Sequence, residues 1–238
     1  MNYLQKSYVI IFFLVFTCEF IYAQKIKIYQ ISGLGADERI YRNLNVDSVD
    51  FIFLDWLKPL KKEKIEQYAT RMLEKIPEDS AYVMGFSFGG MLAVEMWKQR
   101  PGLKLILLST AKTRKEVGAD FHLMGYTGLH KLAPKDFFCK PHSFLVKKFD
   151  VKTEEEKALL EDIIRNSDPD VTDWAINCII YWKNKTIPSD FIHIHGSYDQ
   201  VIRLSNVNAT HVLETGHWLP YDKSEEVGRI VSEYLFSR

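Results

Sequence analysis

The hexapeptide GFSFGG, residues 85–90, places one serine between two phenylalanines and encloses the three with glycines. The apolar run AYVM at 81–84 precedes it, and GGMLAVEMWKQR at 89–100 has a helical composition that Pro101 ends. The stretch therefore predicts a strand, a sharp turn that carries the serine, and a helix.

Gly85, Ser87 and Gly89 spell the pattern G-x-S-x-G. In such a turn the serine hydroxyl is exposed, and the residues two before and two after it approach so closely that side chains would clash. The start of the helix points N–H groups at the place where negative charge would develop, and Phe88 would donate one of them. A glycine-flanked serine can also be a plain tight turn, so the partners of Ser87 decide between the two interpretations.

Short apolar runs alternate with helical patterns on both sides of this turn. Continuous apolar runs are typical of parallel strands that helices cover on both faces. The expected fold is α/β, a doubly wound and mainly parallel sheet of about six strands. The predicted strands are 25–31, 50–56, 80–84, 103–109, 190–196 and 211–216.

Two helices of the predicted sheet layers have clear signals. The stretch 62–76 carries Ile65, Ala69, Met72 and Ile76 at helical spacing. The closing helix is expected to begin near Asp222, whose carboxylate could cap it together with Glu225 three residues on.

The rhythm of strands stops between Lys112 and Ile187. Thr153 opens a T-x-x-E capping signature, and a later helix carries an apolar stripe of Val171, Trp174, Ala175, Cys178, Ile179 and Trp182. We expect a helical cap at 112–187, inserted into an α/β core formed by 24–111 and 188–238.

The length and the charge of the chain limit its number of domains and its classes of partner. A chain of 238 residues with 47% hydrophobic content can build one large domain. Lys plus Arg and Asp plus Glu each number 31, so no basic surface for a nucleic acid is expected.

The first 23 residues have the order of an export signal. Lys6 precedes an apolar run from Tyr8 to Cys18, and Ala23 offers a small-residue cleavage point. The run is too short for a spanning helix, and Glu19 interrupts it. A periplasmic or secreted protein is expected, with an uncleaved or lipidated anchor as the alternative.

The remaining cysteines leave two possibilities open. In an oxidising compartment Cys139 and Cys178 could pair, or each could pack as a small apolar residue. Their spacing fits no zinc pattern.

A reactive serine needs a base, and a histidine is the usual one. Of the seven histidines, only His217 lies on a loop that follows a strand and shortly precedes the final helix, so it is the predicted base. His193 and His195 share one face of a strand, but no third metal ligand is near them in the sequence. We interpret them as structural histidines and expect no metal.

The base needs an orienting acid. Asp199 follows the penultimate predicted strand, and the order Ser87, Asp199, His217 is the one expected when a nucleophile turn lies in an α/β-hydrolase sheet. Four aspartates of the insert are rivals by residue type only: Asp120, Asp136, Asp170 and Asp173.

A second oxyanion donor should come from the loop after the first strand. Gly33 and Gly35 would let the backbone approach a ligand, and the Leu34 N–H could point into the site. A glycine turn without a function is the alternative.

These residues resemble the α/β-hydrolase superfamily, in its serine-nucleophile branch with a helical cap. The resemblance extends from about Lys25 to the C-terminus, and its most specific motifs are ISGLGAD (31–37), VMGFSFGG (83–90), HIHGSYD (193–199) and TGHWLP (215–220). It implies Ser87 as nucleophile, His217 as base, Asp199 as orienting acid, and the Leu34 and Phe88 N–H groups as an oxyanion hole.

The resemblance has two departures. Ser32 stands where many relatives have histidine, and we expect a smaller sheet, without the strands that open the full fold, because the predicted export signal leads directly into the strand before this loop.

The function this implies is hydrolysis of an ester or thioester of a small acyl substrate, without a cofactor. The same residues could instead cleave a C–C bond or act as a lyase, and the fold could serve a binding protein that is not an enzyme.

Overall fold

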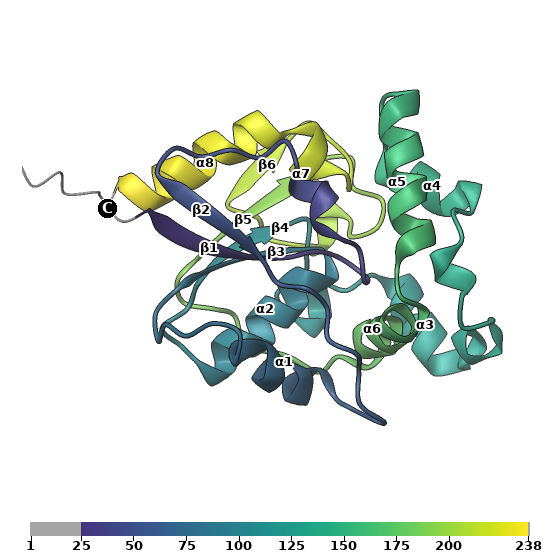
Figure 1. The fold of residues 1–238 in the computed structure, drawn as a ribbon. Coiled ribbons are helices and arrows are strands. Elements are labelled where there is room, and N and C mark those ends of the chain that lie inside the picture. The colour runs from purple at the N-terminus through teal and green to yellow at the C-terminus, as the bar shows by residue number, and fades with distance from the viewer. Residues whose placement is uncertain (1–24, 238) are drawn as a thin grey trace, which may run out of the picture.

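The computed structural model describes residues 25–237, and a six-stranded sheet forms its centre (Figure 1). The order across the sheet is β2-β1-β3-β4-β5-β6, and every neighbouring pair is parallel. The expected doubly wound sheet is confirmed, although the last strand is shorter than predicted. The strands are β1 (Ile26–Ile31), β2 (Val49–Phe53), β3 (Tyr82–Phe86), β4 (Lys104–Leu108), β5 (Phe191–Gly196) and β6 (His211–Leu213).

Helices cover both faces of the sheet. Figure 1 shows α1 (Ile65–Leu73) and α2 (Phe88–Gln99) on one face and α8 (Ser224–Phe236) on the other. Residues of one strand alternate between these two layers. On β3, Val83 packs into the α1 and α2 layer, while Met84 packs into the α8 layer. Both faces exclude water, and this explains the continuous apolar runs in the sequence.

The predicted stripe of α1 is buried, but the helix is shorter than its apolar pattern. Ile65, Ala69 and Met72 lie in the core within the helix, and Ile76 is buried beyond its last residue. The guanidinium of Arg100 donates hydrogen bonds to the carbonyls of Leu73, Ile76 and Glu78. These bonds satisfy carbonyls at the helix end, so the chain can leave the helix while its apolar side chains stay inside.

Between β4 and β5, the chain is helical. Its helices lie beyond the carboxyl end of the sheet (Figure 1), and we call them the cap. The elements of the cap are η2 (Arg114–Glu116), α3 (Ala119–Thr127), η3 (Leu129–Leu132), η4 (Phe137–Cys139), α4 (Ser143–Phe149), α5 (Glu154–Asn166) and α6 (Pro169–Tyr181). The domain boundaries 112 and 187 stay a prediction.

One of the two predicted helix caps is present, and the other is absent. Thr153 caps α5, and Glu156 returns the bond to the Thr153 N–H, as the T-x-x-E signature predicts. The prediction for Asp222 is wrong. A short helix, α7 (Leu219–Asp222), precedes α8, Lys223 stands at the N-terminus of α8, and the Asp222 carboxylate accepts a hydrogen bond from the hydroxyl of Thr215 instead.

Cys139 and Cys178 are not linked to each other. No helix within residues 25–237 has the length and apolarity to cross a bilayer. The predicted export signal, residues 1–23, lies outside the described residues.

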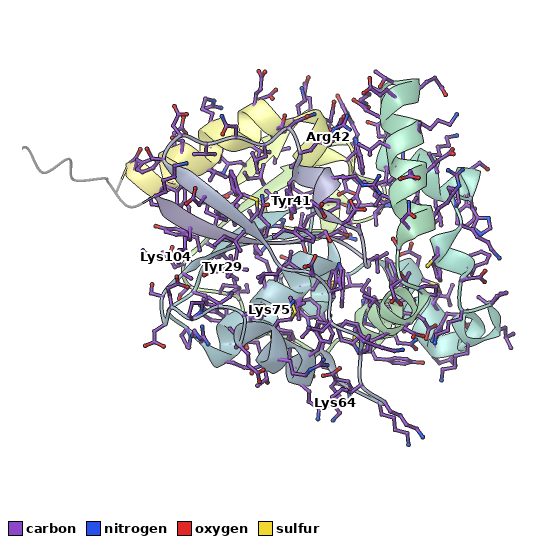
Figure 2. All side chains as sticks on the ribbon, in the orientation of Figure 1. Tyr29, Tyr41, Arg42, Lys64, Lys75 and Lys104 are labelled. Carbon is purple, nitrogen blue, oxygen red and sulfur yellow. The ribbon has the colours of Figure 1, made fainter. Side chains whose placement is uncertain are left out.

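A tyrosine fixes the point where β1 ends. Tyr41, labelled in Figure 2, lies on η1 (Glu38–Tyr41), and its hydroxyl donates a 2.9 Å hydrogen bond to the Ile31 carbonyl. The loop that follows β1 therefore starts from a buried, hydrogen-bonded position.

Lys64 and Lys75, also labelled in Figure 2, lie at the two ends of α1.

Candidate active site

Ser87 joins β3 to α2 in a backbone conformation that L-residues rarely adopt, with φ 53° and ψ −121°. Its N–H donates to the Leu108 carbonyl at 2.9 Å, and its own carbonyl accepts a 2.5 Å bond from the Thr110 hydroxyl. The neighbouring strand β4 and the residues after it thus hold the strained turn in place.

The glycines around Ser87 are needed for space. A Cβ on Gly85 would lie 2.6 Å from the Gly89 carbonyl oxygen, and a Cβ on Gly89 would lie 2.3 Å from that of Ser32. A Cβ on Gly33 would touch the Ser87 Cβ at 3.0 Å. The loop after β1 therefore lies against the serine turn, as the sequence pattern predicts.

Three side chains far apart in the sequence meet at this turn. The Ser87 Oγ lies 3.0 Å from Nε2 of His217, and Nδ1 of the same ring lies 2.7 Å from Oδ2 of Asp199. All three residues are buried, with exposures of 8%, 1% and 4% respectively. Because the carboxylate can only accept, His217 carries its proton on Nδ1, and its Nε2 can accept the proton of the serine hydroxyl.

The turn after β5 holds the carboxylate of Asp199. Its Oδ1 accepts hydrogen bonds from the N–H groups of Val201 at 2.8 Å and Ile202 at 2.9 Å. Burial by itself would raise the pKa of this carboxyl, but the His217 and His195 rings and the backbone donor keep the pKa below its ordinary value. Asp199 is therefore ionised at neutral pH.

Two phenylalanines fix the ring of His217. Its centroid lies 5.0 Å from that of Phe86 and 5.1 Å from that of Phe149, which meets it edge-on. Phe149 belongs to α4 of the cap, and its carbonyl accepts a 3.1 Å bond from the Trp218 N–H. The cap therefore contacts the imidazole directly, which the sequence did not reveal.

The loop after β1 presents a free N–H at the site. Leu34 has φ 35° and Gly35 has φ 73°, and the Thr172 hydroxyl of α6 donates a 3.2 Å bond to the Leu34 carbonyl. Within residues 25–237, the N–H groups of Leu34 and Phe88 have no hydrogen-bond acceptor. Both predicted oxyanion donors are thus available to a ligand.

Ser32 anchors this loop, at the position where the resemblance would place histidine. Its hydroxyl donates to the Ala36 carbonyl, and the indole N–H of Trp56 lies 3.1 Å from both oxygens. The loop is therefore held by hydrogen bonds although it has serine in place of histidine.

An apolar cavity of about 520 Å³ reaches from Ser87 and His217 into the cap. It opens between the sheet and the cap helices, and its charged lining residues are Asp120 and Lys148. Its apolar walls include Phe121, Phe138, Leu145, Leu160, Ile163 and Ile176.

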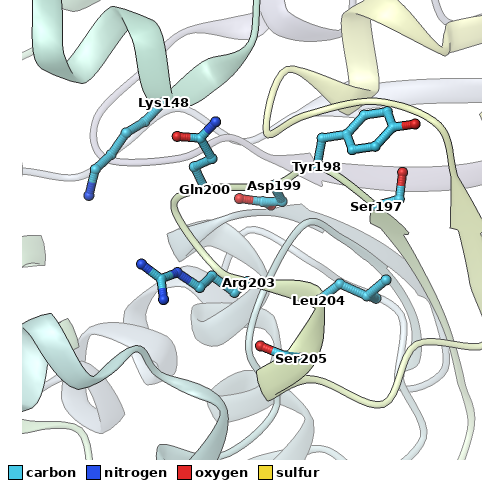
Figure 3. Close-up of a pocket in the computed structure, with 8 residues that line it drawn as sticks. All are labelled: Lys148, Ser197, Tyr198, Asp199, Gln200, Arg203, Leu204 and Ser205. Carbon is cyan, nitrogen blue, oxygen red and sulfur yellow. The ribbon is translucent and has the colours of Figure 1, made fainter.

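A second, shallower groove of about 480 Å³ lies beside the Asp199 turn (Figure 3). Lys148 lines both this groove and the apolar cavity. Figure 3 shows the Lys148 and Arg203 side chains ending on the same side of this view of the groove.

His193 and His195 lie behind Asp199 in a buried row of polar groups. His193 Nδ1 is 2.8 Å from the Lys112 ammonium, and its Nε2 is 3.2 Å from His195 Nδ1. Over the described residues, no three His, Cys, Asp or Glu side chains are placed to hold a metal ion. The interpretation of both rings as hydrogen-bonded structural residues agrees with these contacts.

Three of the four rival aspartates form ion pairs with lysines, and one of these three, Asp120, also lines the apolar cavity. Asp136 pairs with Lys140, and Asp170 pairs with Lys135 and Lys58. Asp120 pairs with Lys148 at 3.7 Å on the cap, and Asp173 accepts a hydrogen bond from Asn177 at its carbonyl. Among residues 25–237, no histidine is hydrogen-bonded to or ion-paired with any of these four aspartates.

Solved structures show the same fold. An esterase from Exiguobacterium antarcticum superposes with a TM-score of 0.71 at 14% identity, and the match covers 89% of this chain and 92% of the esterase. An esterase from Thermogutta terrifontis superposes with a TM-score of 0.68 at 14% identity, over 90% of each chain. A lipase-esterase related protein from Clostridium acetobutylicum gives 0.66 at 14% identity, over 87% of this chain and 93% of that one.

The fold is therefore that of the α/β-hydrolases. No protein-family model matches the sequence, and no curated protein matches it either.

Proposed function

We propose that this protein is a serine hydrolase that cleaves an ester or thioester through an acyl-enzyme intermediate. The observation that carries the proposal is the continuous hydrogen-bonded row from Ser87 Oγ through His217 to Asp199, at 3.0 and 2.7 Å. A hydroxyl, a base and an orienting carboxylate in this arrangement are what nucleophilic catalysis by serine requires. The likeness in fold to solved esterases supports the same class of reaction.

In the first half of the reaction, Ser87 Oγ attacks the carbonyl carbon, and its proton passes to Nε2 of His217. The carbonyl oxygen becomes an oxyanion, which accepts hydrogen bonds from the Leu34 and Phe88 N–H groups. The imidazolium then gives its proton to the leaving alcohol or thiol as the bond to the carbonyl carbon breaks. The products of this half are the free leaving group and an ester of Ser87.

In the second half, a water molecule attacks that ester while His217 takes its proton. The new tetrahedral oxyanion accepts hydrogen bonds from the same two N–H groups. When it collapses, the proton held by His217 passes to Ser87 Oγ and the acid is released. Asp199 stays ionised throughout and stabilises the imidazolium of His217 in each half. No step needs a cofactor.

The acyl group is proposed to enter the apolar cavity at Ser87. Its walls are phenylalanine, leucine and isoleucine side chains of the cap and the sheet, so each buried methylene of a substrate would add up to about 0.8 kcal/mol of binding. Medium-length acyl chains should therefore be better substrates than acetate.

Export is a separate proposal. It depends on the order of residues 1–23 in the sequence, in which one lysine precedes a short apolar run and a small-residue cleavage point.

Hydrolysis of p-nitrophenyl esters of graded acyl length tests the proposed function. The parent protein should release nitrophenol, with kcat/KM rising from acetate to hexanoate, and Ser87→Ala should abolish release. A folded parent protein that hydrolyses no ester of the series, or a Ser87→Ala protein with undiminished rates, would overturn the proposal.

A further inference from the structure

We propose that the preferred substrates carry a negative charge close to the scissile bond, held between Lys148 and Arg203 in the groove of Figure 3. This inference rests on the proposed function. It adds the class of substrate: an ester or thioester with an apolar acyl chain and an anionic leaving group, such as a carboxylate or phosphate.

The charges of the groove support an anion rather than a cation. Its charged side chains are Lys148, Arg203 and Asp199. The Asp199 carboxylate is 4% exposed and is already bonded to His217 and two backbone N–H groups, so little of its charge faces the groove.

Arg203 is exposed, and across residues 25–237 its guanidinium has neither an ion-pair partner nor a hydrogen-bond acceptor. Lys148 is partly neutralised, by Asp120 at 3.7 Å. A guanidinium and an ammonium that line one groove are well suited to a planar or tetrahedral anion.

The position of Lys148 joins the groove to the proposed reaction. Lys148 precedes Phe149, which packs on the His217 ring, and it lines the apolar cavity as well as the groove. An acyl chain in the cavity would therefore leave the other part of the substrate on the His217 side, next to Lys148 and to the groove that Arg203 also lines.

Two butanoate esters test this inference, one of 4-nitrophenol and one of 4-hydroxybenzoate. In Arg203→Ala and in Lys148→Ala, the kcat/KM for the anionic ester divided by that for the neutral ester should fall about tenfold, as for the loss of one charge-assisted contact. Lys147→Ala is the matched control, because it removes the adjacent cation of α4, which does not line the groove. That variant should leave the ratio within about twofold of the parent value.

The outcomes separate the two proposals. An unchanged ratio in Arg203→Ala and Lys148→Ala, with both esters hydrolysed, overturns the anionic substrate alone. Equal losses in Lys147→Ala would assign the effect to general charge and overturn it too. If the folded parent hydrolyses neither ester, the proposed function and this inference fail together.

A different observation, the buried row behind Asp199, carries a second inference. We infer that Lys112, His193 and His195 form a hydrogen-bonded row with a single allowed proton order, which positions the turn that holds Asp199. All three side chains are at most 2% exposed.

The proton order follows from the two ends of the row. At one end, the Ile202 carbonyl can only accept, so Nε2 of His195, 2.7 Å away, must carry a proton. Nδ1 of neutral His195 then accepts from Nε2 of His193, and Nδ1 of His193 accepts from the ammonium of Lys112. That ammonium is paired with Glu116 at 2.9 Å.

Neutral rings fit their surroundings. Burial lowers the pKa of His193 to about 2, and Lys112 and His195 face it. Burial also lowers the pKa of His195, which faces Asp199, His217 and Lys112.

The row acts on Asp199 through Ile202. The Ile202 N–H donates to the Asp199 carboxylate at 2.9 Å, while its carbonyl is the acceptor of His195. His195 is therefore a positioning residue: it holds the carbonyl of Ile202, the residue whose N–H orients Asp199, and its Nε2–H also faces Asp199 Oδ2 at 3.5 Å.

The nitrogen chemical shifts of the histidine rings in the unmodified protein test the proton order at pH 7. His193 and His195 should both carry their proton on Nε2, whereas His217 should carry it on Nδ1. A doubly protonated ring, or a proton on Nδ1 of His195, overturns the inference whether or not the protein hydrolyses esters.

Two substitutions of His195 test its effect on the proposed reaction. In His195→Gln, the amide nitrogen can take the place of Nε2 and still reach Ile202, while the shorter side chain of His195→Asn can only take the place of Nδ1. We expect kcat to fall at least about tenfold in His195→Asn, with KM little changed, and to recover most of that loss in His195→Gln. Equal losses in two folded variants, or no loss in either, contradict a positioning role through Ile202.

Discussion

The hydroxyl of Thr172, on cap helix α6, donates a 3.2 Å hydrogen bond to the carbonyl of Leu34, whose N–H is the proposed oxyanion donor. A bond between residues 138 positions apart in the sequence therefore anchors the loop that would supply this N–H. Leu34 has a positive φ of 35°, so the bond to its carbonyl helps to hold the residue in this rarely adopted conformation, and with it the N–H on the other side of its Cα.

Thr172→Val should weaken the oxyanion hole without emptying the core, because the two side chains have nearly the same shape. We expect kcat for a p-nitrophenyl ester to fall about tenfold, which is less than the loss for removing a donor outright. Steady-state kinetics measure this. Thr70→Val, which removes an exposed hydroxyl on α1, is the matched control. An unaltered kcat in Thr172→Val would show that α6 does not orient Leu34.

Asp199→Asn should leave the fold intact and remove most of the activity. The amide could donate to His217 Nδ1 and so favour the wrong tautomer, and it would not stabilise the imidazolium. We expect kcat to fall by about a thousandfold or more at neutral pH. Asp173→Asn, a change on α6 outside the site, should keep the parent rate. Comparable activity in Asp199→Asn would exclude Asp199 from the proposed role.

The width of the apolar cavity should set the acyl preference. Leu145→Trp adds a large ring to its wall, so the ratio of kcat/KM for octanoate to that for acetate should fall about tenfold, the equivalent of two lost methylene contacts. Leu132→Trp enlarges an exposed leucine of the cap and serves as the control. If both variants shift the ratio equally, the cavity is not the acyl site.

Stability should fall as the solution becomes acidic. In the unfolded chain His193 and His195 take up protons near pH 6.5, whereas the folded protein resists this because burial lowers the pKa of both rings. Their contribution to stability is complete above pH 6.5 and is lost as the pH falls toward the folded values.

Urea unfolding at a series of pH values measures this loss. The free energy of unfolding should drop by about 1 kcal/mol or more for each pH unit between pH 6 and pH 5. Asp199, whose folded pKa is lowered, adds a further loss only below about pH 4. His122→Gln, a change of an exposed histidine, should leave the slope as it is. A flat stability between pH 7 and pH 5 would contradict the neutral buried row.

The sequence predicts the sheet and the positions of Ser87, Asp199 and His217 because the signals for both are local. Apolar runs mark the strands, glycines mark the turns at the carboxyl ends, and parallel strands bring those ends together. The order of Ser87, Asp199 and His217 along the chain therefore predicts that all three lie at one edge of the sheet.

Contacts that depend on how the cap folds onto the sheet could not be predicted. Thr172 reaches the site from a helix whose sequence shows only an apolar stripe, and nothing in that stripe says which loop it will meet. Phe149 reaches it from α4, a helix for which the sequence shows no signal. The hydrogen-bonded row from Lys112 to His195 could not be predicted either. A lysine is usually exposed, and only the folded structure shows that Lys112 contacts His193 of β5.

The prediction for Asp222 failed for a related reason. Its carboxylate had two possible partners, the N-terminus of α8 and the hydroxyl of Thr215, and packing of the loop after β6 selected the second.

Covalent labelling by a fluorophosphonate probe, followed by peptide mapping, tests the central claim most directly, because the probe needs a nucleophilic serine, a base and an oxyanion hole at once. We predict one label per molecule on the peptide that contains Ser87, no label in Ser87→Ala, and strongly slowed labelling in His217→Ala. Folded protein that stays unlabelled while a known serine hydrolase reacts in the same tube, or a label that persists in Ser87→Ala, would contradict the account.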